Sequence, residues 1–509
     1  MMNLDFIERF YEKYSIPVAT QAILSVAFIL IIAFLMTRIT KKLRLPNVTA
    51  YILSGILIGP YVFNLIPQNI ISGMSFIQDM GLGFIAFASG RYFNLNIIRR
   101  NGFRPLILGL FQALATSAAV FLVMLAFGFS VPIALVIGSI GGTTSSASTL
   151  MTIREYRCEG EFVDYSIEVN SIDNLFGILS FSVCLGVALA TLSSGKSFSA
   201  FKVVWLPILV NLGLMVLGGL LAFLMGKVIN KPTRTHDNRL ILTVFCILAL
   251  VGVCGLSRLF SPDLAVTPLL SVMVFAMVYV NLTSDESVFD QVADFSAPIT
   301  LIFFCLSGMK FQISYLGSVG LAGVVYFFVR LLMKYGSSYL GGVISKSPKT
   351  VRDWIGFTME PQAGISLGLA AILLSSFTAL SAEKGDGSLA EVGAQINAII
   401  VFAGILYEIV GPALAKLALK KSGVLSEEKR ISASGNGPLL VRSESMLHDA
   451  VVIEEDPALL KKRAELSELK KNLDEANLYI HTKDYTDASS EGSFKGNVPP
   501  SFPKFTNKK

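Results

Sequence analysis

The chain has 509 residues, of which 15% are charged and 53% hydrophobic, and its mean hydropathy is +0.63. Globular domains that face water carry about 25% charged residues, so this composition excludes a secreted enzyme, a nucleic-acid binder and a disulfide scaffold. Several apolar runs exceed the roughly 18 residues that cross a bilayer as a helix, which predicts a polytopic membrane protein.

The first residues include Asp5, Glu8 and Glu12 in place of the basic segment of a signal peptide, so the first apolar run is expected to stay in the protein. The apolar runs do not alternate with polar residues as the strands of a membrane barrel do. Because lipid requires backbone hydrogen bonds to be satisfied within the chain, we expect an all-α membrane protein with about 13 transmembrane helices. The spans lie near 16–37, 46–64, 70–90, 104–127, 131–152, 162–194, 203–226, 240–258, 264–282, 294–309, 314–345, 353–380 and 392–419.

The charges of the loops predict the orientation of these spans. Loops after odd-numbered spans hold seventeen Lys and Arg residues, and loops after even-numbered spans hold five. Because cytoplasmic loops are enriched in these residues, the N-terminus is expected outside and the C-terminus in the cytoplasm. One odd loop, 284–291, is acidic and departs from the pattern.

Two polar, helix-weakening stretches interrupt the fifth and twelfth apolar runs, at 138–148 and 359–366. Paired interruptions in the two halves of a transporter are typical of broken helices that cross at the bilayer midplane in an inverted repeat. Close packing of helices through small residues is the alternative interpretation. Glu360 stands directly before Pro361 at the second stretch, so it is either a second buried carboxylate or an interfacial one.

Ionisable residues inside apolar runs are functional candidates, because each costs at least about 2.5 kcal/mol at the centre of a span. The strongest candidate is Asp173, which is followed by a long apolar run. A buried carboxylate can hold either a proton or a cation, and competition between the two is the simplest exchange chemistry. The alternative is a carboxylate that caps or bridges helices. Glu168, five residues earlier, is expected at the membrane interface. The three histidines lie outside the spans, so carboxylates would handle any protons.

The second candidate is Lys334, which lies in mid-span and shares a helix face with Arg330, four residues before it. A lysine at this depth needs a carboxylate partner, and Asp173 is the natural one. The alternative is that the long lysine side chain extends to the cytoplasmic surface.

The last ninety residues contain 15 basic and 14 acidic side chains, and their Gly- and Pro-rich stretches are typical of linkers or disorder. We therefore divide the chain into a transmembrane domain, 1–420, and a partly disordered cytoplasmic tail, 421–509, with a possible helix at 457–479. No strand is followed by a glycine-rich phosphate loop, so we expect no nucleotide-binding domain.

Four motifs, in chain order, resemble the monovalent cation:proton antiporter-2 family. They cover the membrane part of the chain from about residue 40 to 420, and several matched motifs in order are far more specific than one. The motifs are LPNVTAYILSGILIGP at 45–60, GLGFIAFASG at 81–90, PQAGISLG at 361–368 and EIVGP at 408–412.

The resemblance implies an inverted-repeat sodium/proton antiporter fold, in which two broken helices cross. It further implies a homodimer whose moving core gives elevator-like alternating access, with Lys334 paired to the first member of an acidic pair. Carried over by position, Thr143, Thr144 and Ser145 would lie at the first break, and Gln362, Ala363 and Gly364 at the second.

The sequence departs from the family at one position. The family often has two consecutive aspartates, the second of them assigned to cation binding, whereas this chain has Asp173 and Asn174. Asparagine can bind a cation through its carbonyl oxygen but cannot exchange a proton near neutral pH. Either Asp173 both binds the cation and exchanges the proton, or the coupling differs from that of the familiar sodium antiporters.

These observations predict secondary exchange of sodium or potassium for protons at the cell (inner) membrane. The predicted role of this exchange is pH homeostasis. The predicted ion and proton site is Asp173, Asn174 and the first break, with Lys334 as charge partner. A gated cation channel or a membrane-embedded ion or pH sensor on the same scaffold is the alternative. Since no catalytic triad, metal cluster or nucleotide loop stands out, we expect no enzyme, no cofactor and no metal beyond the transported cation. At the second break the candidates are Glu360, Gln362 and Gly364.

Overall fold

The computed structural model describes most of the chain up to residue 425. The described residues are 13–42, 46–93, 101–193, 205–229, 236–260, 267–283 and 286–425, together with residues 11, 95 and 99. The chain divides into two units, Met1–Leu439 and Leu440–Lys509, and the second lies outside the described residues. The expected helix at 457–479 therefore also lies outside them, and the division of the chain at residue 420 stays a prediction.

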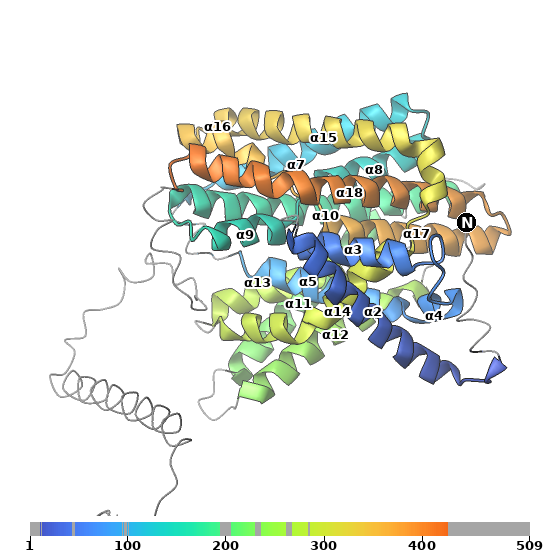
Figure 1. The fold of residues 1–509 in the computed structure, drawn as a ribbon. Coiled ribbons are helices and arrows are strands. Elements are labelled where there is room, and N and C mark those ends of the chain that lie inside the picture. The colour runs from blue at the N-terminus through green and yellow to red at the C-terminus, as the bar shows by residue number, and fades with distance from the viewer. Residues whose placement is uncertain are drawn as a thin grey trace, which may run out of the picture. The chain divides into compact units, whose positions relative to one another are not determined.

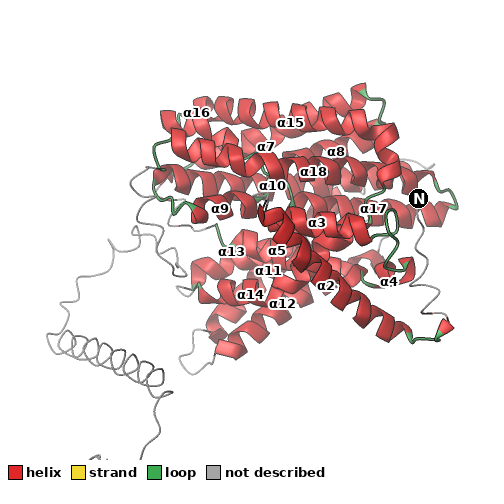
Figure 2. Cartoon of the chain, in the orientation of Figure 1, coloured by secondary structure: helices red, strands yellow, loops and turns green. Residues whose placement is uncertain are grey.

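Helices connected by turns and short loops make up the described residues, with no strand among them (Figures 1 and 2). The predicted all-α architecture is thus confirmed. In chain order the helices are α2 (Val18–Lys42), α3 (Asn47–Ile58), α4 (Gln68–Gly73), α5 (Ser75–Gly90), α7 (Arg104–Ala126), α8 (Val131–Gly142), α9 (Ser146–Glu155), α10 (Glu161–Ser193), α11 (Leu206–Ile229), α12 (His236–Phe260), α13 (Pro268–Leu282), α14 (Ser287–Met309), the 3-10 turn η2 (Ile313–Tyr315), α15 (Leu316–Ile344), α16 (Lys349–Thr358), α17 (Gly364–Lys384) and α18 (Ser388–Lys421).

Within the described residues, nine helices are long and apolar enough to cross a membrane. Three further apolar helices, α3, α8 and α13, are shorter. One of these, α8, is short because it is half of an interrupted helix. The multi-pass character of the chain is therefore clear, while the count of about 13 spans stays a prediction.

The two predicted interruptions are present. The helix that begins at Val131 stops at Gly142 and resumes at Ser146, and the one that begins at Lys349 stops at Thr358 and resumes at Gly364. Pro361 lies in the second gap, where its missing N–H and its ring prevent a continuous helix. The Ser145 N–H donates to the Pro361 carbonyl at 2.7 Å, so the two gaps are in direct contact.

A group of long helices surrounds the two gaps. The first broken helix packs through α8 against α7 and α10, and the second packs through α17 against α18. The same group includes α15, which contacts α7, α16 and α18 (Figure 1). A Cβ added to Gly177 of α10 would lie 2.5 Å from Thr143 Cγ2, so only glycine lets α10 approach the first gap this closely.

The remaining helices form a second packed group. In it α3 and α5 both pack against α14, while α13 packs against α5 and α11. At the crossing of α3 and α14, a Cβ on Gly55 would collide with the Cys305 carbonyl, and one on Gly308 would collide with the Ile52 carbonyl. The two helix backbones are therefore in contact through glycines, which is a common arrangement for helices in lipid.

The acidic loop that departed from the charge pattern has a direct structural explanation. Arg91, at the end of α5, contacts Glu286 Oε2 at 3.0 Å through Nη2 and Asp290 Oδ1 at 2.7 Å through Nη1. Both segments follow odd-numbered predicted spans, so they are expected on the same side of the membrane, as the ion pairs require. Glu286 and Asp290 thus neutralise Arg91, a basic residue of another loop.

Candidate ion-binding site

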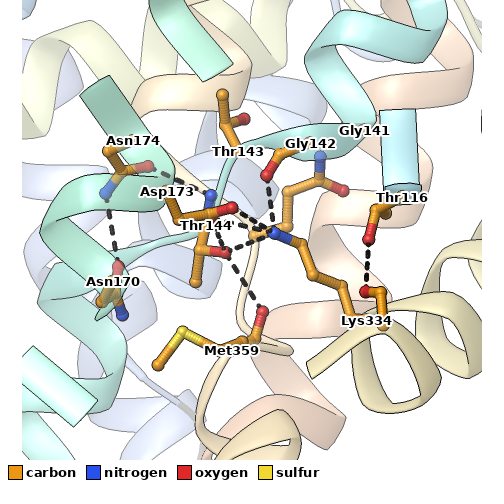
Figure 3. A network of polar contacts seen from close by, with 12 residues as sticks. Thr116, Gly141, Gly142, Thr143, Thr144, Asn170, Asp173, Asn174, Lys334 and Met359 are labelled. Carbon is orange, nitrogen blue, oxygen red and sulfur yellow. Dashed lines mark hydrogen bonds and ion pairs between the residues drawn. The ribbon is translucent and has the colours of Figure 1, made fainter. Parts of the chain in front are cut away.

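A buried ion pair lies where the two interrupted helices meet. Lys334 Nζ, from α15, donates to Asp173 Oδ2 of α10 at 2.8 Å and to Oδ1 at 3.0 Å. Both side chains are 0% exposed. The same ammonium group also donates to the Gly142 carbonyl at 2.6 Å and to Thr144 Oγ1 at 2.9 Å (Figure 3). Lys334 therefore points into the protein, and its side chain does not extend to the surface.

Thr144 joins this ion pair to both interruptions. Its hydroxyl lies 2.5 Å from Asp173 Oδ2 and 3.2 Å from the Met359 carbonyl. Thr144 belongs to the first gap and Met359 to the second (Figure 3). A displacement of either gap would therefore change the hydrogen bonding of the carboxylate.

Asn174 is held by three hydrogen bonds that fix the orientation of its amide. Its Oδ1 accepts from the Thr144 N–H at 3.1 Å, and its Nδ2 donates to Ser146 Oγ at 2.7 Å and to Asn170 Oδ1 at 3.3 Å. Ser146 Oγ in turn donates to Asn170 Oδ1 at 3.0 Å. The carbonyl of Asn174 thus faces Thr144 in the first gap, and its NH₂ group faces Ser146, the first residue of α9, and Asn170. The surroundings of this position are arranged for an amide.

Arg330 of α15 bonds the backbone around the two gaps. Its guanidinium donates to three backbone carbonyls, those of Gly141 at 2.9 Å, Glu360 at 2.9 Å and Thr143 at 2.7 Å. The side chain is 0% exposed. Carbonyls at the end of a helix carry partial negative charge, and a cation stabilises them. Sequence reasoning placed Arg330 on the same face as Lys334 but gave it no role.

The other predicted residues of the two gaps connect the gaps to each other. Thr143 Oγ1 lies 2.8 Å from Ser366 Oγ, and Gln362 Nε2 donates to the Ile140 carbonyl at 3.2 Å and to Tyr326 Oη at 2.8 Å. Gly364 is the first residue of α17. Of the predicted set, Thr144 and Lys334 contact Asp173 directly, and Asn174 contacts it through Thr144. The ion-binding roles themselves stay predictions.

Two further carboxylates lie in the interior. Glu360 is 1% exposed, so it is buried, and neither of its carboxylate oxygens has a hydrogen-bond partner among the described residues. Glu168 is 2% exposed, and Asn101 Nδ2 donates to its Oε2 at 3.0 Å. Glu168 therefore faces other protein groups, and its expected depth at the membrane interface stays a prediction.

Sequence reasoning missed a fourth buried carboxylate. Glu408 of α18 is 0% exposed, and Ser148 Oγ donates to its Oε1 at 2.7 Å. The motif that contains Glu408 contributed to the family resemblance, but no role was assigned to the residue. A glutamate inside an apolar run, four residues before Pro412, is the signal that could have found it.

A small cavity lies beside Ser146 and Asn170. It has a volume of about 10 Å³, room for about one water molecule, and Ser146, Asn170, Thr149 and Ser166 contribute to its lining. Two of these residues are the hydrogen-bond acceptors of the Asn174 amide.

The carboxylate, hydroxyl and carbonyl oxygens near Asp173 are the ligand types that hard cations prefer. Within the described part of the chain, no group of three His, Cys, Asp or Glu residues is arranged to hold a metal ion.

A buried carboxylate at the contact of two interrupted helices, in a multi-pass bundle, is typical of secondary transporters. Residues 28–415 match the family described as sodium/hydrogen exchanger, transmembrane, and the chain belongs to this family. Its class is therefore that of the cation:proton antiporters.

Individual proteins show the same likeness. The Na(+)/H(+) antiporter 1 of Methanocaldococcus jannaschii is 23% identical over 382 residues, which cover 71% of this chain and 84% of that protein. The structure of the sodium proton antiporter MjNhaP1 from this organism at pH 8 matches with a TM-score of 0.66 at 21% identity, over 80% of this chain and 100% of that one. An electron-microscopy structure of MjNhaP1 matches with a TM-score of 0.63 at 17% identity, over 82% and 99%. The predicted antiporter fold is confirmed.

Proposed function

We propose that this protein exchanges a monovalent cation, sodium or potassium, for protons across the cell membrane. The observation that carries the proposal is the Asp173 carboxylate, which is fully buried and bonded to Lys334 and Thr144 at the contact of the two helix gaps. The family supports cation:proton antiport, and the identity of the cation is our proposal.

Exchange follows from the charge of this pair. A cation that binds the Asp173 oxygens competes with Lys334 Nζ for the same carboxylate. Two positive charges cannot both be balanced by one carboxylate in a medium of low dielectric constant. Binding of the cation is therefore coupled to the loss of a proton from the pair, and release of the cation is coupled to its return.

Neutral groups complete the cation site. The Asn174 carbonyl and the Thr144 hydroxyl both lie next to Asp173 and can supply oxygen ligands. Because Asn174 is an amide, it adds no proton of its own to the exchange. The same oxygen set suits sodium and potassium, so selectivity has to be measured.

We further propose elevator-type alternating access by a homodimer, with the N-terminus outside and the C-terminus in the cytoplasm. One observation bears on the moving core and one on the orientation. The two gaps are hydrogen-bonded to each other, from the Ser145 N–H to the Pro361 carbonyl, so they can move together. The loop charges are also strongly biased to one side of the predicted spans.

Flux measurements in proteoliposomes test the proposal. Proton flux would be followed against gradients of sodium, potassium or lithium and against an ion-free control, with and without a clamped voltage. We expect flux that requires a cation, saturates and reverses with the cation gradient. Proton or cation flux that follows voltage without a counter-ion would instead support a channel. Binding of an ion without any flux would support a sensor.

A further inference from the structure

Glu408 has the features of a second proton site. It lies on α18, outside the group of residues that contact Asp173, and its side chain is 0% exposed. Ser148 Oγ donates to Oε1 at 2.7 Å, whereas Oε2 has no hydrogen-bond partner among the described residues. Among the described residues, Glu408 also forms no ion pair. A charged carboxylate in this position would be buried with only one hydrogen bond to stabilise it.

The charges around the two gaps do not balance. The described buried side chains there comprise three carboxylates, Asp173, Glu360 and Glu408, and two cations, Arg330 and Lys334. Lys334 is occupied by Asp173, and Arg330 donates to three backbone carbonyls. An uncompensated charge in the membrane interior is costly. With all five groups charged, the cluster carries one net negative charge, which one further proton would remove. Arg330 and Lys334 interact electrostatically with the Glu360 carboxylate, whereas Glu408 has no cation among its interactions with the described residues, so Glu408 is the better place for that proton.

The helices packed against α18 bring no other cation to Glu408. The neighbours are α3, α9, α15, α16, α17 and η2. Of these, α3 and η2 contain no Asp, Glu, Lys or Arg, and the charged residues of α9, α16 and α17 lie in the half of each helix that is remote from the gaps. From α15, Arg330 lies over the ring of Tyr407, with its Cζ 4.5 Å from the ring centroid, while its donors face the carbonyls.

A chain of hydroxyl groups leads from Glu408 to the first gap. Ser148 Oγ lies 3.1 Å from Ser145 Oγ, and Ser145 is bonded through its N–H to the Pro361 carbonyl of the second gap. Ser148 has one hydroxyl hydrogen. When Glu408 is charged, Ser148 donates to it and accepts from Ser145. When Glu408 carries the proton on Oε1, it can donate to Ser148, and Ser148 then donates to Ser145. Protonation of Glu408 thus reverses the direction of both hydrogen bonds.

We propose that Glu408 is a second proton-carrying site, filled and emptied through Ser148 and Ser145, which supplies the titratable carboxylate that Asn174 lacks. The inference rests on the proposed antiport and sets its ratio. In each cycle one proton leaves the Asp173–Lys334 pair as the cation binds, and a second leaves Glu408 to water while the site is open to the aqueous side, where its charge is hydrated, so that exchange moves net charge.

The first test compares the wild type with Glu408→Gln in proteoliposomes, where the gradient at which flux reverses gives the ratio of protons to cations. The amide keeps the size of the side chain and cannot take part in proton exchange. We expect Glu408→Gln to exchange one proton fewer per cation than the wild type, and its flux to lose its dependence on voltage. The matched control is Glu391→Gln, an exposed position on the same helix, which should keep the wild-type ratio. An unchanged ratio in Glu408→Gln would overturn the proposal.

The second test detects the proton on Glu408 directly, so it gives an answer even if Glu408→Gln does not transport. Infrared difference spectra would be recorded on the reconstituted protein before and after addition of sodium or potassium. We expect a protonated carboxyl band that disappears with the cation in the wild type and in Glu391→Gln but is missing in Glu408→Gln. In Ser148→Ala, which removes the donor to Oε1, the same band should shift in frequency. Identical spectra for wild type and Glu408→Gln would refute the proton site. Absence of flux in the wild type would count against the antiport alone.

Discussion

Lys334 Nζ lies 2.8 Å from Asp173 Oδ2, and neither side chain is exposed. The two residues are 161 positions apart in the chain, on helices that approach the two gaps from different sides. A buried pair of this kind is held by its mutual charge and by additional hydrogen bonds, here from Thr144 and to the Gly142 carbonyl. Removal of either partner would leave the other as an uncompensated charge in the interior.

Asp173→Asn should abolish cation-coupled proton flux and leave the protein folded, because a buried Lys334 without its partner can release its proton and become neutral. Asparagine keeps an oxygen for the Thr144 hydroxyl but can neither bind a cation through charge nor exchange a proton. Flux in proteoliposomes and thermal unfolding in detergent give the two readouts. Asp386→Asn, on the exposed loop between α17 and α18, is the matched control and should exchange normally. Normal exchange by Asp173→Asn would refute the assigned site.

Lys334→Met should destabilise the fold more than the double change Asp173→Asn with Lys334→Met. The single change leaves a buried carboxylate without its cation, which typically costs about 3–5 kcal/mol, whereas removal of both charges is often nearly neutral. Unfolding free energies of the two variants check this order. The single variant should also have a shifted pH profile of exchange. If its stability and pH profile equal those of the wild type, Lys334 is not the charge partner.

Asn174→Asp should lower the free energy of unfolding by about 1–3 kcal/mol, the usual effect of leaving buried polar groups unsatisfied. The carboxylate cannot donate to Ser146 Oγ and Asn170 Oδ1, as the amide does. Asn69→Asp is the control, because exposed Asn69 uses only its side-chain oxygen, which accepts from the Ile70 N–H. Its stability should be unchanged. Equal melting temperatures for Asn174→Asp and the wild type would contradict the amide network.

Gly411→Ala should impair exchange by displacing the second gap. A Cβ at this position of α18 would lie 2.8 Å from Pro361 Cγ, and such overpacking typically costs about 1–3 kcal/mol. Gly336→Ala on α15 is the control, since an added Cβ there meets nothing within 4 Å. That change should be neutral or slightly stabilising, because alanine favours a helix. Transport rates and unfolding of both variants give the comparison, and equal effects would contradict the packing argument.

The predicted orientation can be tested by labelling single cysteines in intact cells. Asp386→Cys follows the twelfth predicted span and should react with a membrane-impermeant maleimide added outside. Lys349→Cys precedes that span on the other side and should react only after the membrane is permeabilised. Both positions are exposed, and the native cysteines are buried or half-buried. The reverse pattern would invert the topology.

Much of this protein follows from its sequence alone. Low charge and long apolar runs determine a helical membrane bundle, and the glycine, serine, threonine and proline stretches at 138–148 and 359–366 locate both interruptions, because these residues weaken a helix locally. The rarity of charge inside the spans also identified Asp173 and Lys334. Each of these signals is local, or is a matter of composition.

Only the tertiary structure decided which groups meet. The three carbonyls that Arg330 bonds come from the end of α8 and from both gaps, and the contact of Ser148 with Glu408 joins residues 260 positions apart. The orientation of the Asn174 amide likewise depends on partners from two different helices. Apolar periodicity is set by the nearest turns of a helix, and it carries no information on which distant polar atoms will satisfy a buried charge. That choice is made when the helices pack, because a buried polar group without a partner is costly.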